Sequence, residues 1–296
     1  MARIAFIGLG NMGGGMAANL AQAGHDVRAF DLSAEALGRA KDAGCLPADS
    51  AEAACEGAEA VVTMLPAGKH VSQVYAEGVI GHAPPSAILI DCSTIDVATA
   101  REVAERATAA GYAAVDAPVS GGIAAASAGT LTFMVGGSVA AFARAEEYLS
   151  VMGKAVIHAG ASGAGQAAKI CNNMLLGATM VATCETLVLA EKLGLDPQKF
   201  YDIASVSSGS CWSLNTYAPL PGVGPQTPAD NDYQGGFAAA LMLKDLRLAM
   251  EAAGGAGADT PMGARAAELY ETFVAADEGN HDFSGIIRML GRDQAR

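Results

Sequence analysis

The sequence has few basic residues, and this shortage excludes several classes of partner. Of its 296 residues, 18 are Lys or Arg and 31 are Asp or Glu, which gives a formal charge of −13 at pH 7. Proteins that bind nucleic acid need clustered Lys and Arg against the phosphates, so nucleic acid is excluded and an anionic membrane surface is disfavoured. The chain is 51% hydrophobic and 17% charged. That composition predicts a folded protein with a sizeable core.

Cysteine pairs and uninterrupted apolar runs are also missing. The six cysteines contain no C-x-x-C pair, and their scattered spacing predicts neither a zinc site nor a disulfide framework. Such cysteines are typical of a cytosolic protein. The longest apolar stretch, 170–190, is interrupted by Asn172, Asn173 and Glu185, so we expect no membrane span. The first ten residues indicate a short strand leading into a glycine turn rather than a signal peptide. The expected location is the cytoplasm.

The first half of the chain alternates short apolar strands with helices. The expected strands are Arg3–Ile7, Asp26–Phe30, Ala60–Leu65, Ala87–Asp91, Ala113–Ala117, Leu131–Val135 and Ala155–Ala159. The helices between them are Asn11–Ala23, Ala34–Ala43, Val97–Ala110 and Ala140–Met152. Alternating βα units predict an α/β Rossmann domain with a parallel, doubly wound sheet, which we assign to residues 1–163.

After residue 163 the strand signals fade and helical patterns dominate. We expect a second, all-α domain over 164–296, joined to the first by one long apolar helix, Ala164–Leu193. A helix that is apolar nearly all round is predicted to be buried, here against the other domain or a second subunit. Further helices are expected at Pro197–Val206, Ala238–Ala253, Ala264–Ala276 and Phe283–Leu290.

A glycine-rich turn follows the first strand and opens a helix. Its residues are Gly8, Leu9, Gly10, Asn11, Met12 and Gly13, the G-x-G-x-x-G pattern in the context that dinucleotide binding requires. The cofactor phosphates are expected at the helix N-terminus. Asp31 ends the second strand, where a carboxylate can bind the ribose 2′-OH and repels a 2′-phosphate. This predicts NAD rather than NADP, although Asp31 could also act only as an acid at the start of the next helix.

Two further strand ends are candidates for contact with the cofactor. Cofactors in this fold lie across the carboxyl ends of the strands. Leu65 and Pro66 follow one strand, and Ser93 and Thr94 follow the next. We predict that Leu65, Pro66 and Thr94 lie beside the ribose and nicotinamide, although each could belong to an ordinary loop.

Lys169 is the strongest candidate for acid–base chemistry. It is the only formally charged residue between Lys154 and Glu185, and it lies near the start of the long apolar helix. A lysine there loses solvation unless it has a function, or it extends to the surface from the first helical turn. Asn172 and Asn173 follow at spacings that place at least one amide on the same face.

Two other features are weaker candidates. Lys244 interrupts an apolar run and is followed by Asp245, a pattern that an exposed helical ion pair also produces. Ser120, Gly121 and Gly122 follow a strand, where a hydroxyl and consecutive backbone N–H groups can bind a carboxylate. Ser-Gly-Gly is also common in ordinary turns.

Other dehydrogenase chemistries lack their residues. No Tyr is followed four residues later by Lys, and no set of His, Cys and Glu has zinc spacing. The five histidines form no motif. Lysine is the remaining acid–base group, and no metal is expected.

These motifs together resemble the β-hydroxyacid dehydrogenase family over essentially the whole chain. The segments that carry the resemblance are Phe6–Gly13, Asp116–Gly122, Gly163–Asn173, Ser207–Gly209, Cys211–Trp212, Asn231–Phe237 and Lys244–Asp245. The last four are similar to the branch that oxidises 3-hydroxyisobutyrate. Two residues depart from the pattern, because Gly15 stands where the family often has Pro and Ser210 where this branch commonly has Arg.

The resemblance implies a role for each candidate residue. Lys169 would be the catalytic acid–base group, and Phe237 would approach the nicotinamide. Lys244 would reach both cofactor and substrate. The implied substrate-binding residues are Ser120, Gly121, Gly122, Asn173, Trp212, Tyr217, Lys244 and Asp245. The resemblance also implies a helical domain that mediates oligomerisation, as a homodimer or homotetramer.

The expected reaction is therefore NAD-dependent oxidation of a small 3-hydroxy acid, as in valine catabolism. Lys169 would accept the hydroxyl proton while hydride leaves, with its pKa lowered by burial and a neighbouring positive charge. Alternatives within the family are oxidation of L-serine and reduction of tartronate or succinate semialdehyde, whereas 6-phosphogluconate would need more basic residues. The alternative from another class is a non-catalytic NAD-binding protein.

Overall fold

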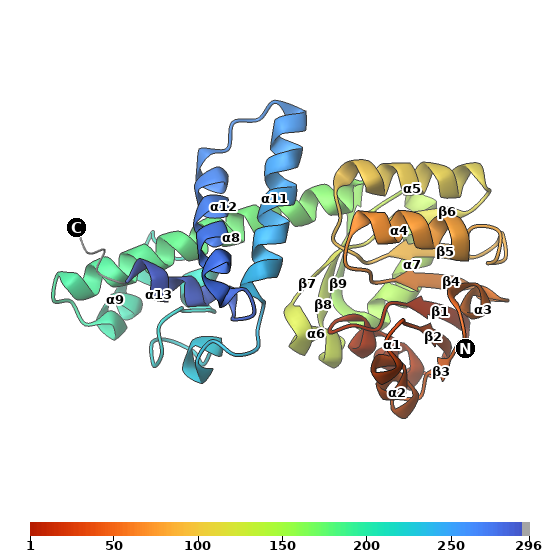
Figure 1. Cartoon of the computed structure of the whole chain (residues 1–296), viewed down its shortest axis with the longest axis horizontal. Helices are drawn as coiled ribbons and strands as arrows, with labels where there is room; N and C mark the ends of the chain where they lie inside the picture. Colours follow the sequence, from red (N-terminus) through yellow and green to blue (C-terminus); the bar gives the residue numbers. More distant parts are fainter. Residues whose placement is uncertain (292–296) are drawn as a thin grey trace. The chain divides into compact units, whose positions relative to one another are not determined.

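The computed structural model describes residues 1–291 and divides into two compact units. The first comprises Met1–Lys169, and the second begins at Ile170. The division falls within one helix, α8 (Ala164–Lys192), which begins in the first unit and continues in the second (Figure 1). The sequence instead placed the domain boundary at the start of this helix.

The first unit is an α/β layer structure, as predicted. Its strands are β1 (Arg3–Ile7), β2 (Asp26–Phe30), β3 (Leu46–Pro47), β4 (Ala60–Thr63), β5 (Ile88–Asp91), β6 (Ala113–Asp116), β7 (Val119–Ser120), β8 (Leu131–Gly136) and β9 (Gly153–Gly160). Its helices are α1 (Gly13–Gln22), α2 (Ala34–Asp42), α3 (Ala51–Cys55), α4 (Gly68–Val74), α5 (Val97–Ala109), α6 (Gly122–Ala128) and α7 (Val139–Met152), with a π-helical turn, η1, at Tyr75–Val79.

The strands form one sheet in the order β3-β2-β1-β4-β5-β6-β8-β7, with β9 beside β8. The six strands from β3 to β6 in this order are parallel, as expected for a Rossmann fold. The predicted parallel sheet has one antiparallel edge, because β8 runs antiparallel to β6 and β7. The chain reverses after Asp116 through the short strand β7, which was not among the predicted strands.

Alternate residues of the strands face two separate hydrophobic cores, which explains the doubly wound arrangement. In β1, Ile4 and Phe6 pack with α1, α2 and α7, whereas Ala5 and Ile7 pack with α3, α4 and α5. Figure 1 shows α1 and α2 on one side of the strands and α4 and α5 on the other. Strands buried on both faces read as continuous apolar runs, which is why the sequence predicted them well.

The second unit is helical, as predicted. Its helices after α8 are α9 (Pro197–Ala204), α10 (Trp212–Asn215), η2 (Pro228–Asn231), α11 (Ala239–Ala256), α12 (Pro261–Phe273), η3 (Val274–Glu278), η4 (Phe283–Ile286) and α13 (Ile287–Leu290). Helices α11 and α12 run side by side (Figure 1). Their core includes Met180, Leu246, Tyr270 and Phe283. The sequence placed the start of α12 at Ala264, but Pro261 occupies its first turn, a position that Pro favours.

Helix α8 is only partly covered within the single chain, so burial of its remaining surface against a second subunit stays a prediction. Met180 and Cys184 are fully buried, but Leu175 and Leu189 are 63% and 56% exposed. Among the described residues, α8 is also the one helix that could cross a membrane by length and mean hydropathy, which reaches 1.4. Core helices of soluble proteins meet the same criterion, and 44% of the most apolar window of α8 is buried, so this evidence for a span is weak.

Candidate active site

Two glycines of the turn between β1 and α1 are required on steric grounds. Gly8 adopts φ +96°, and a Cβ there would lie 2.3 Å from the Met64 carbonyl oxygen. A Cβ on Gly13 would lie 2.0 Å from the Gly8 carbonyl oxygen, so only glycine lets the helix start this close to the strand. Gly10 has open space above it. The first and third glycines therefore shape the turn, and the second leaves its backbone open to a ligand.

The Asp31 carboxylate is fixed by this same turn. Its Oδ2 accepts a 2.6 Å hydrogen bond from Leu9 N, and its Oδ1 accepts a 2.8 Å bond from Ser33 N. Helix α2 is capped by Ser33, whose hydroxyl accepts from Ala36 N. The alternative that Asp31 acts only as a helix acid is therefore unnecessary. The carboxylate is held beside the glycine-rich turn, at the place where a ribose hydroxyl is bound in this fold.

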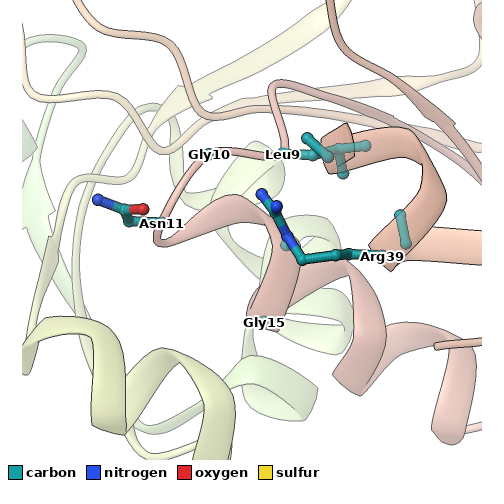
Figure 2. A pocket seen from close by; sticks show the side chains of 8 residues that line it. Leu9, Gly10, Asn11, Gly15 and Arg39 are labelled. Atoms are coloured by element: carbon teal, nitrogen blue, oxygen red, sulfur yellow. The ribbon is translucent and has the colours of Figure 1, made fainter. Parts of the chain in front are cut away.

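A cavity of about 350 Å³ borders the glycine-rich turn (Figure 2). Its lining residues come from the turn, α1 and α2, and they are Leu9, Gly10, Asn11, Gly14, Gly15, Ala36, Arg39 and Ala40. Figure 2 shows the Arg39 side chain extending from α2 toward α1 and the turn. Arg39 was not among the predicted residues; its guanidinium pairs with Glu35 at 2.6 Å and lies beside the expected phosphate site. Together with the uncapped N-terminus of α1, these features fit an anionic dinucleotide.

Gly15, one of the two departures from the family pattern, packs against α6. A Cβ at this position would lie 3.0 Å from Ser127 N and 3.1 Å from the Ala126 carbonyl carbon. Any side chain here would therefore force α1 and α6 apart by a few tenths of an ångström. The glycine therefore allows close packing of α1 against α6, and it also lines the cavity beside the glycine-rich turn.

Three buried polar residues end adjacent strands of the sheet. Thr63, Asp91 and Asp116 are in register, with 0%, 5% and 4% of their surfaces exposed. The Asp91 Oδ1 accepts hydrogen bonds from the Thr63 hydroxyl at 2.7 Å and the Ser93 hydroxyl at 2.6 Å. The Ser93 hydroxyl oxygen in turn accepts from Leu65 N at 2.8 Å. One carboxylate thus fixes both loops that the sequence predicted to contact the cofactor.

Burial dominates the electrostatics of these strand ends. It raises the pKa of Asp91 to about 6, with an added contribution from the charge of Asp116, although three hydrogen bonds oppose the shift. The pKa of Asp116 is raised for the same reason, against backbone hydrogen bonds from Gly163 and Gln166. Both carboxylates therefore bind protons more tightly than they would in water.

The structure places Ser120, Gly121 and Gly122 at the junction of β7 and α6. Gly121 has φ +136° and Gly122 has φ +72°, so the backbone turns sharply here. A Cβ on Gly121 would lie 2.6 Å from the Ala125 Cβ. Ser120 and Gly122 are half-buried and Gly121 is exposed. The turn therefore presents backbone that small ligands can approach, as a carboxylate-binding segment requires.

Lys169 lies on α8 and is only 7% exposed, although it is a lysine. The alternative of a side chain that extends into solvent is therefore contradicted. Asn173, four residues further along the helix, is 2% exposed. This spacing places Lys169 and Asn173 on one face of α8.

Within the second unit, three predicted substrate-binding residues are brought together. The Asn173 side-chain amide donates a 2.5 Å hydrogen bond to Asp245 Oδ2, and Lys244 Nζ lies 3.8 Å from Asp245 Oδ1. Asn172 donates to Asn173 Oδ1 at 2.9 Å. Asp245 is 3% exposed, whereas the Lys244 side chain is 34% exposed. A buried carboxylate therefore orients an amide and a cation from α8 and α11.

The predicted aromatic residues also gather in the second unit. The rings of Trp212 and Tyr217 stack with centroids 4.9 Å apart, and Tyr217 and Phe237 each contact Phe283. Trp212 is 50% exposed, so this aromatic group has an open side. Phe283 was not among the predicted site residues, and it joins rings that are distant in sequence.

Asp282, fully buried, connects these aromatic residues and was also missed. Its Oδ2 accepts hydrogen bonds from the Tyr217 hydroxyl at 2.9 Å and from Phe237 N at 2.7 Å. Its Oδ1 accepts from the Ser284 hydroxyl at 2.6 Å. Burial raises the pKa of Asp282, and burial also raises the pKa of Tyr217. A Cβ at Gly236 would lie 2.1 Å from this carboxylate, so the segment before Phe237 requires glycine.

The residues that were not predicted lie in segments whose sequence gives only weak local signals. Asp282 begins an Asp-x-Ser turn, and Asp116 and Gln166 lie inside segments already noted for the family resemblance. None of these patterns reveals a partner that is distant along the chain. Among the described residues, no group of three or more His, Cys, Asp or Glu side chains is arranged to hold a metal.

Two family models match the chain and together span almost all of it. The NAD binding domain of 6-phosphogluconate dehydrogenase matches residues 3–160. The model described as NAD-binding of NADP-dependent 3-hydroxyisobutyrate dehydrogenase matches residues 163–290. The models meet close to the start of α8.

Relatives of known name are similar along their full length. The chain is 51% identical to 3-hydroxyisobutyrate dehydrogenase of Pseudomonas aeruginosa, over 99% of this chain and 100% of the relative. It is 44% identical to the NAD-dependent L-serine dehydrogenase of the same organism, over 100% of both chains. Its structure matches that of Mycobacterium tuberculosis 3-hydroxyisobutyrate dehydrogenase with L-serine at a TM-score of 0.95 and 48% identity, covering 99% and 100% of the two chains.

Proposed function

Because the chain belongs to the 3-hydroxyisobutyrate dehydrogenase family, we propose that it oxidises 3-hydroxyisobutyrate to methylmalonate semialdehyde with NAD, a step of valine catabolism. The observation that carries this proposal is Lys169, a buried lysine in an apolar helix at the position of the family's acid–base residue. A lysine is buried at the expense of its hydration, and chemistry is one reason to keep it there.

The glycine-rich turn and its neighbours are proposed to bind the cofactor. The residues assigned to NAD are Gly8, Leu9, Gly10, Asn11, Met12, Gly13, Asp31, Leu65, Pro66, Thr94, Phe237 and Lys244. When bound, NAD supplies the hydride acceptor. The Asp31 carboxylate, fixed by Leu9 N, supports NAD because it would repel a 2′-phosphate. This choice differs from the NADP-dependent enzymes named in the description of the second family model.

The substrate is proposed to be held by its carboxylate and deprotonated at its hydroxyl. Ser120, Gly121 and Gly122 bind the carboxylate through the hydroxyl and backbone N–H groups. Lys169 accepts the hydroxyl proton as the hydride departs, and its protonated form stabilises the alkoxide in the reverse direction. The remaining residues assigned to substrate binding are Asn173, Trp212, Tyr217, Lys244 and Asp245.

L-serine is the second candidate substrate. It shares a carboxylate and a hydroxymethyl group with 3-hydroxyisobutyrate but carries an ammonium group in place of the methyl group. Two relatives favour its inclusion, since one is named an L-serine dehydrogenase and the solved mycobacterial enzyme is described with L-serine. Reduction of tartronate or succinate semialdehyde would use the same proton donor and remains a weaker alternative.

The assembly and location are part of the proposal. Leu175 and Leu189 on α8 and Ile203 on α9 are all more than half exposed. Exposed leucine and isoleucine side chains on neighbouring helices support a homodimer or homotetramer formed through the second unit. The scattered cysteines are all free, which supports a reducing compartment such as the cytoplasm.

The proposal is tested by following NADH formation at 340 nm with the purified protein. The panel is 3-hydroxyisobutyrate, L-serine, D-glycerate, 4-hydroxybutyrate and 6-phosphogluconate, each with NAD or NADP. We expect the highest kcat/KM for 3-hydroxyisobutyrate with NAD. A higher value for L-serine would favour the second candidate. No turnover with any substrate, together with measurable NAD binding, would instead support a non-catalytic protein.

A further inference from the structure

The loop after β5 presents one residue and buries its two neighbours. Ser93 and Ile95 are 0% and 1% exposed, whereas Thr94 between them is half-buried. The Ser93 side chain is bonded to Asp91 and Leu65, as described above, and Asp96 caps helix α5 through Thr99 N at 2.7 Å. Thr94, which is assigned to cofactor binding, therefore lies in a loop that hydrogen bonds fix at both ends.

The side-chain amide of Gln166, in α8, forms hydrogen bonds with the backbone of this loop. Its side-chain Nε2 donates a 2.7 Å hydrogen bond to the Ser93 carbonyl oxygen, and its Oε1 accepts a 3.1 Å bond from Ile95 N. The amide thus pairs with the two backbone groups that flank Thr94, as a neighbouring strand would. Gln166 is 0% exposed, so water cannot replace either bond.

The helical turn that carries Gln166 is itself fixed to the sheet. The Asp116 carboxylate at the end of β6 accepts hydrogen bonds from Gly163 N at 2.7 Å and from Gln166 N at 2.9 Å. A Cβ at Gly165 would lie 2.4 Å from the Met134 carbonyl oxygen. The first turn of α8 therefore rests directly on the strand ends and has no room to slide toward them.

Lys169 follows Gln166 by three residues on the same helix, a rise of about 4.5 Å along the axis. Both residues belong to the first unit, as does the Thr94 loop. A single side chain thus joins the loop assigned to the cofactor and the turn that carries the proposed acid–base residue.

We propose that Gln166 is a positioning residue for hydride transfer, because its amide sets the placement of Thr94 relative to Lys169. The inference rests on the proposed roles of those two residues. Hydride and proton must leave adjacent atoms of the substrate, so the cofactor loop and the base must keep a fixed separation. Misplacement by about 1 Å is enough to lower a rate 100-fold.

The competing explanation is that Gln166 only satisfies buried backbone groups. Losing it would then lower the free energy of unfolding and leave the chemistry of the folded enzyme unchanged. A positioning role predicts in addition that hydride transfer becomes slower in the protein that remains folded.

The first test is Gln166→Met, which keeps the length of the side chain and removes both hydrogen bonds. We expect kcat to fall by about 10- to 100-fold, with little change in the dissociation constant of NAD measured by calorimetry. With substrate deuterated at the hydroxymethyl carbon, the isotope effect on kcat should be at least as large as in the unaltered enzyme. Unchanged kcat, or a lower kcat with a smaller isotope effect, would overturn the proposal.

The matched control is Tyr112→Phe, which also removes two hydrogen bonds from the first unit, one buried and one partly buried. The Tyr112 hydroxyl donates to the Ala83 carbonyl at 2.8 Å and accepts from Gly81 N at 3.0 Å. Tyr112 directly precedes β6, so it lies at the amino ends of the strands, whereas the site lies at their carboxyl ends. We expect a lower Tm for this variant with unchanged kcat and isotope effect. An equal loss of kcat in both variants would show that Gln166 only stabilises the fold.

A second variant, Gln166→Glu, keeps the proposal testable if the methionine variant fails to fold. Its neutral carboxyl group can donate to the Ser93 carbonyl and accept from Ile95 N, whereas its ionised form cannot donate. The charged or titratable groups near it are Asp116, which is bonded to the same turn, Asp91, which is bonded to Ser93, and Lys169. We expect kcat relative to the unaltered enzyme to rise as the pH falls, and a constant ratio would contradict the proposal. Full kcat in Lys169→Ala would refute the proposed function instead.

Discussion

Carboxylates hold the candidate residues in both units, but they bind different kinds of partner. In the first unit, Asp31 and Asp116 accept hydrogen bonds from backbone N–H groups of nearby turns. In the second unit, Asp282 accepts hydrogen bonds from the Tyr217 hydroxyl and from Phe237 N, which are 65 and 45 residues away in sequence. The first arrangement fixes loops along a sheet edge, and the second holds a helical unit together around one charge.

The two units should therefore respond differently to substitution of their carboxylates. Removing a strand-end carboxylate from the first unit should disturb local loops and cofactor binding, because the sheet and its two cores remain. Removing Asp282 should disturb folding, because three segments lose their shared acceptor. The variants below separate these effects, beginning with the largest expected change.

The largest effect is expected for Lys169→Ala. Loss of the acid–base group should lower kcat by about 1,000-fold, while NAD still binds. Steady-state kinetics and calorimetric titration with NAD measure the two quantities. Lys154→Ala, at an exposed position of the same unit, is the control and should keep full activity. Near-normal kcat in Lys169→Ala would remove the assigned role.

Asp282→Ala should produce the largest loss of stability. It leaves the Tyr217 hydroxyl, Phe237 N and the Ser284 hydroxyl without their acceptor inside the protein, and we expect a loss of about 3 kcal/mol in urea unfolding. Asp259→Ala, at an exposed position of the second unit, is the control and should change stability little. A loss below about 1 kcal/mol for Asp282→Ala would show that the carboxylate is not the centre of this unit.

Asp91→Asn tests the electrostatic part of the comparison. Because burial raises the pKa of Asp91 to about 6 from its ordinary 3.8, the folded protein binds more protons than the unfolded chain between these values. This residue therefore lowers stability as the pH rises through that window, by about 3 kcal/mol in total. The asparagine variant lacks this slope, so its Tm relative to the unaltered protein should rise from pH 4 to pH 7. A pH-independent difference in Tm would contradict the assignment.

The smallest effect is expected for Asp31→Ser, which changes cofactor choice rather than chemistry. Loss of the carboxylate should raise the KM for NAD by about tenfold, equivalent to about 1.4 kcal/mol, and should lower the KM for NADP. The activity at saturating NAD should be nearly unchanged. Kinetics with the two cofactors check this, and an unaltered preference for NAD would place the discrimination at residues other than Asp31.

The comparison also explains what could be predicted from the sequence. Gly8, Asp31 and Thr94 were found because each follows a buried strand, and the carboxyl ends of parallel strands meet at one edge. Asp282 could not be found this way, because its partners are brought to it by the packing of helices and long loops. The strand β8 was predicted, but its antiparallel direction was not, because its apolar pattern does not record its direction.

Lys169 and Gln166 illustrate the same limit within one helix. The lysine was conspicuous as an isolated charge among apolar residues. Gln166 lies three residues earlier in a segment already noted for its glycines, but its partners Ser93 and Ile95 are more than 70 positions away. Only the fold shows that its amide closes the Thr94 loop.

The most direct test of the proposed reaction is a single turnover with 3-hydroxyisobutyrate deuterated at the hydroxymethyl carbon and unlabelled NAD. The proposal predicts that the deuterium appears in the reduced cofactor and that methylmalonate semialdehyde forms in equal amount, both measured by mass spectrometry. Reduced cofactor without deuterium, or no product while NAD remains bound, would contradict hydride transfer from this carbon.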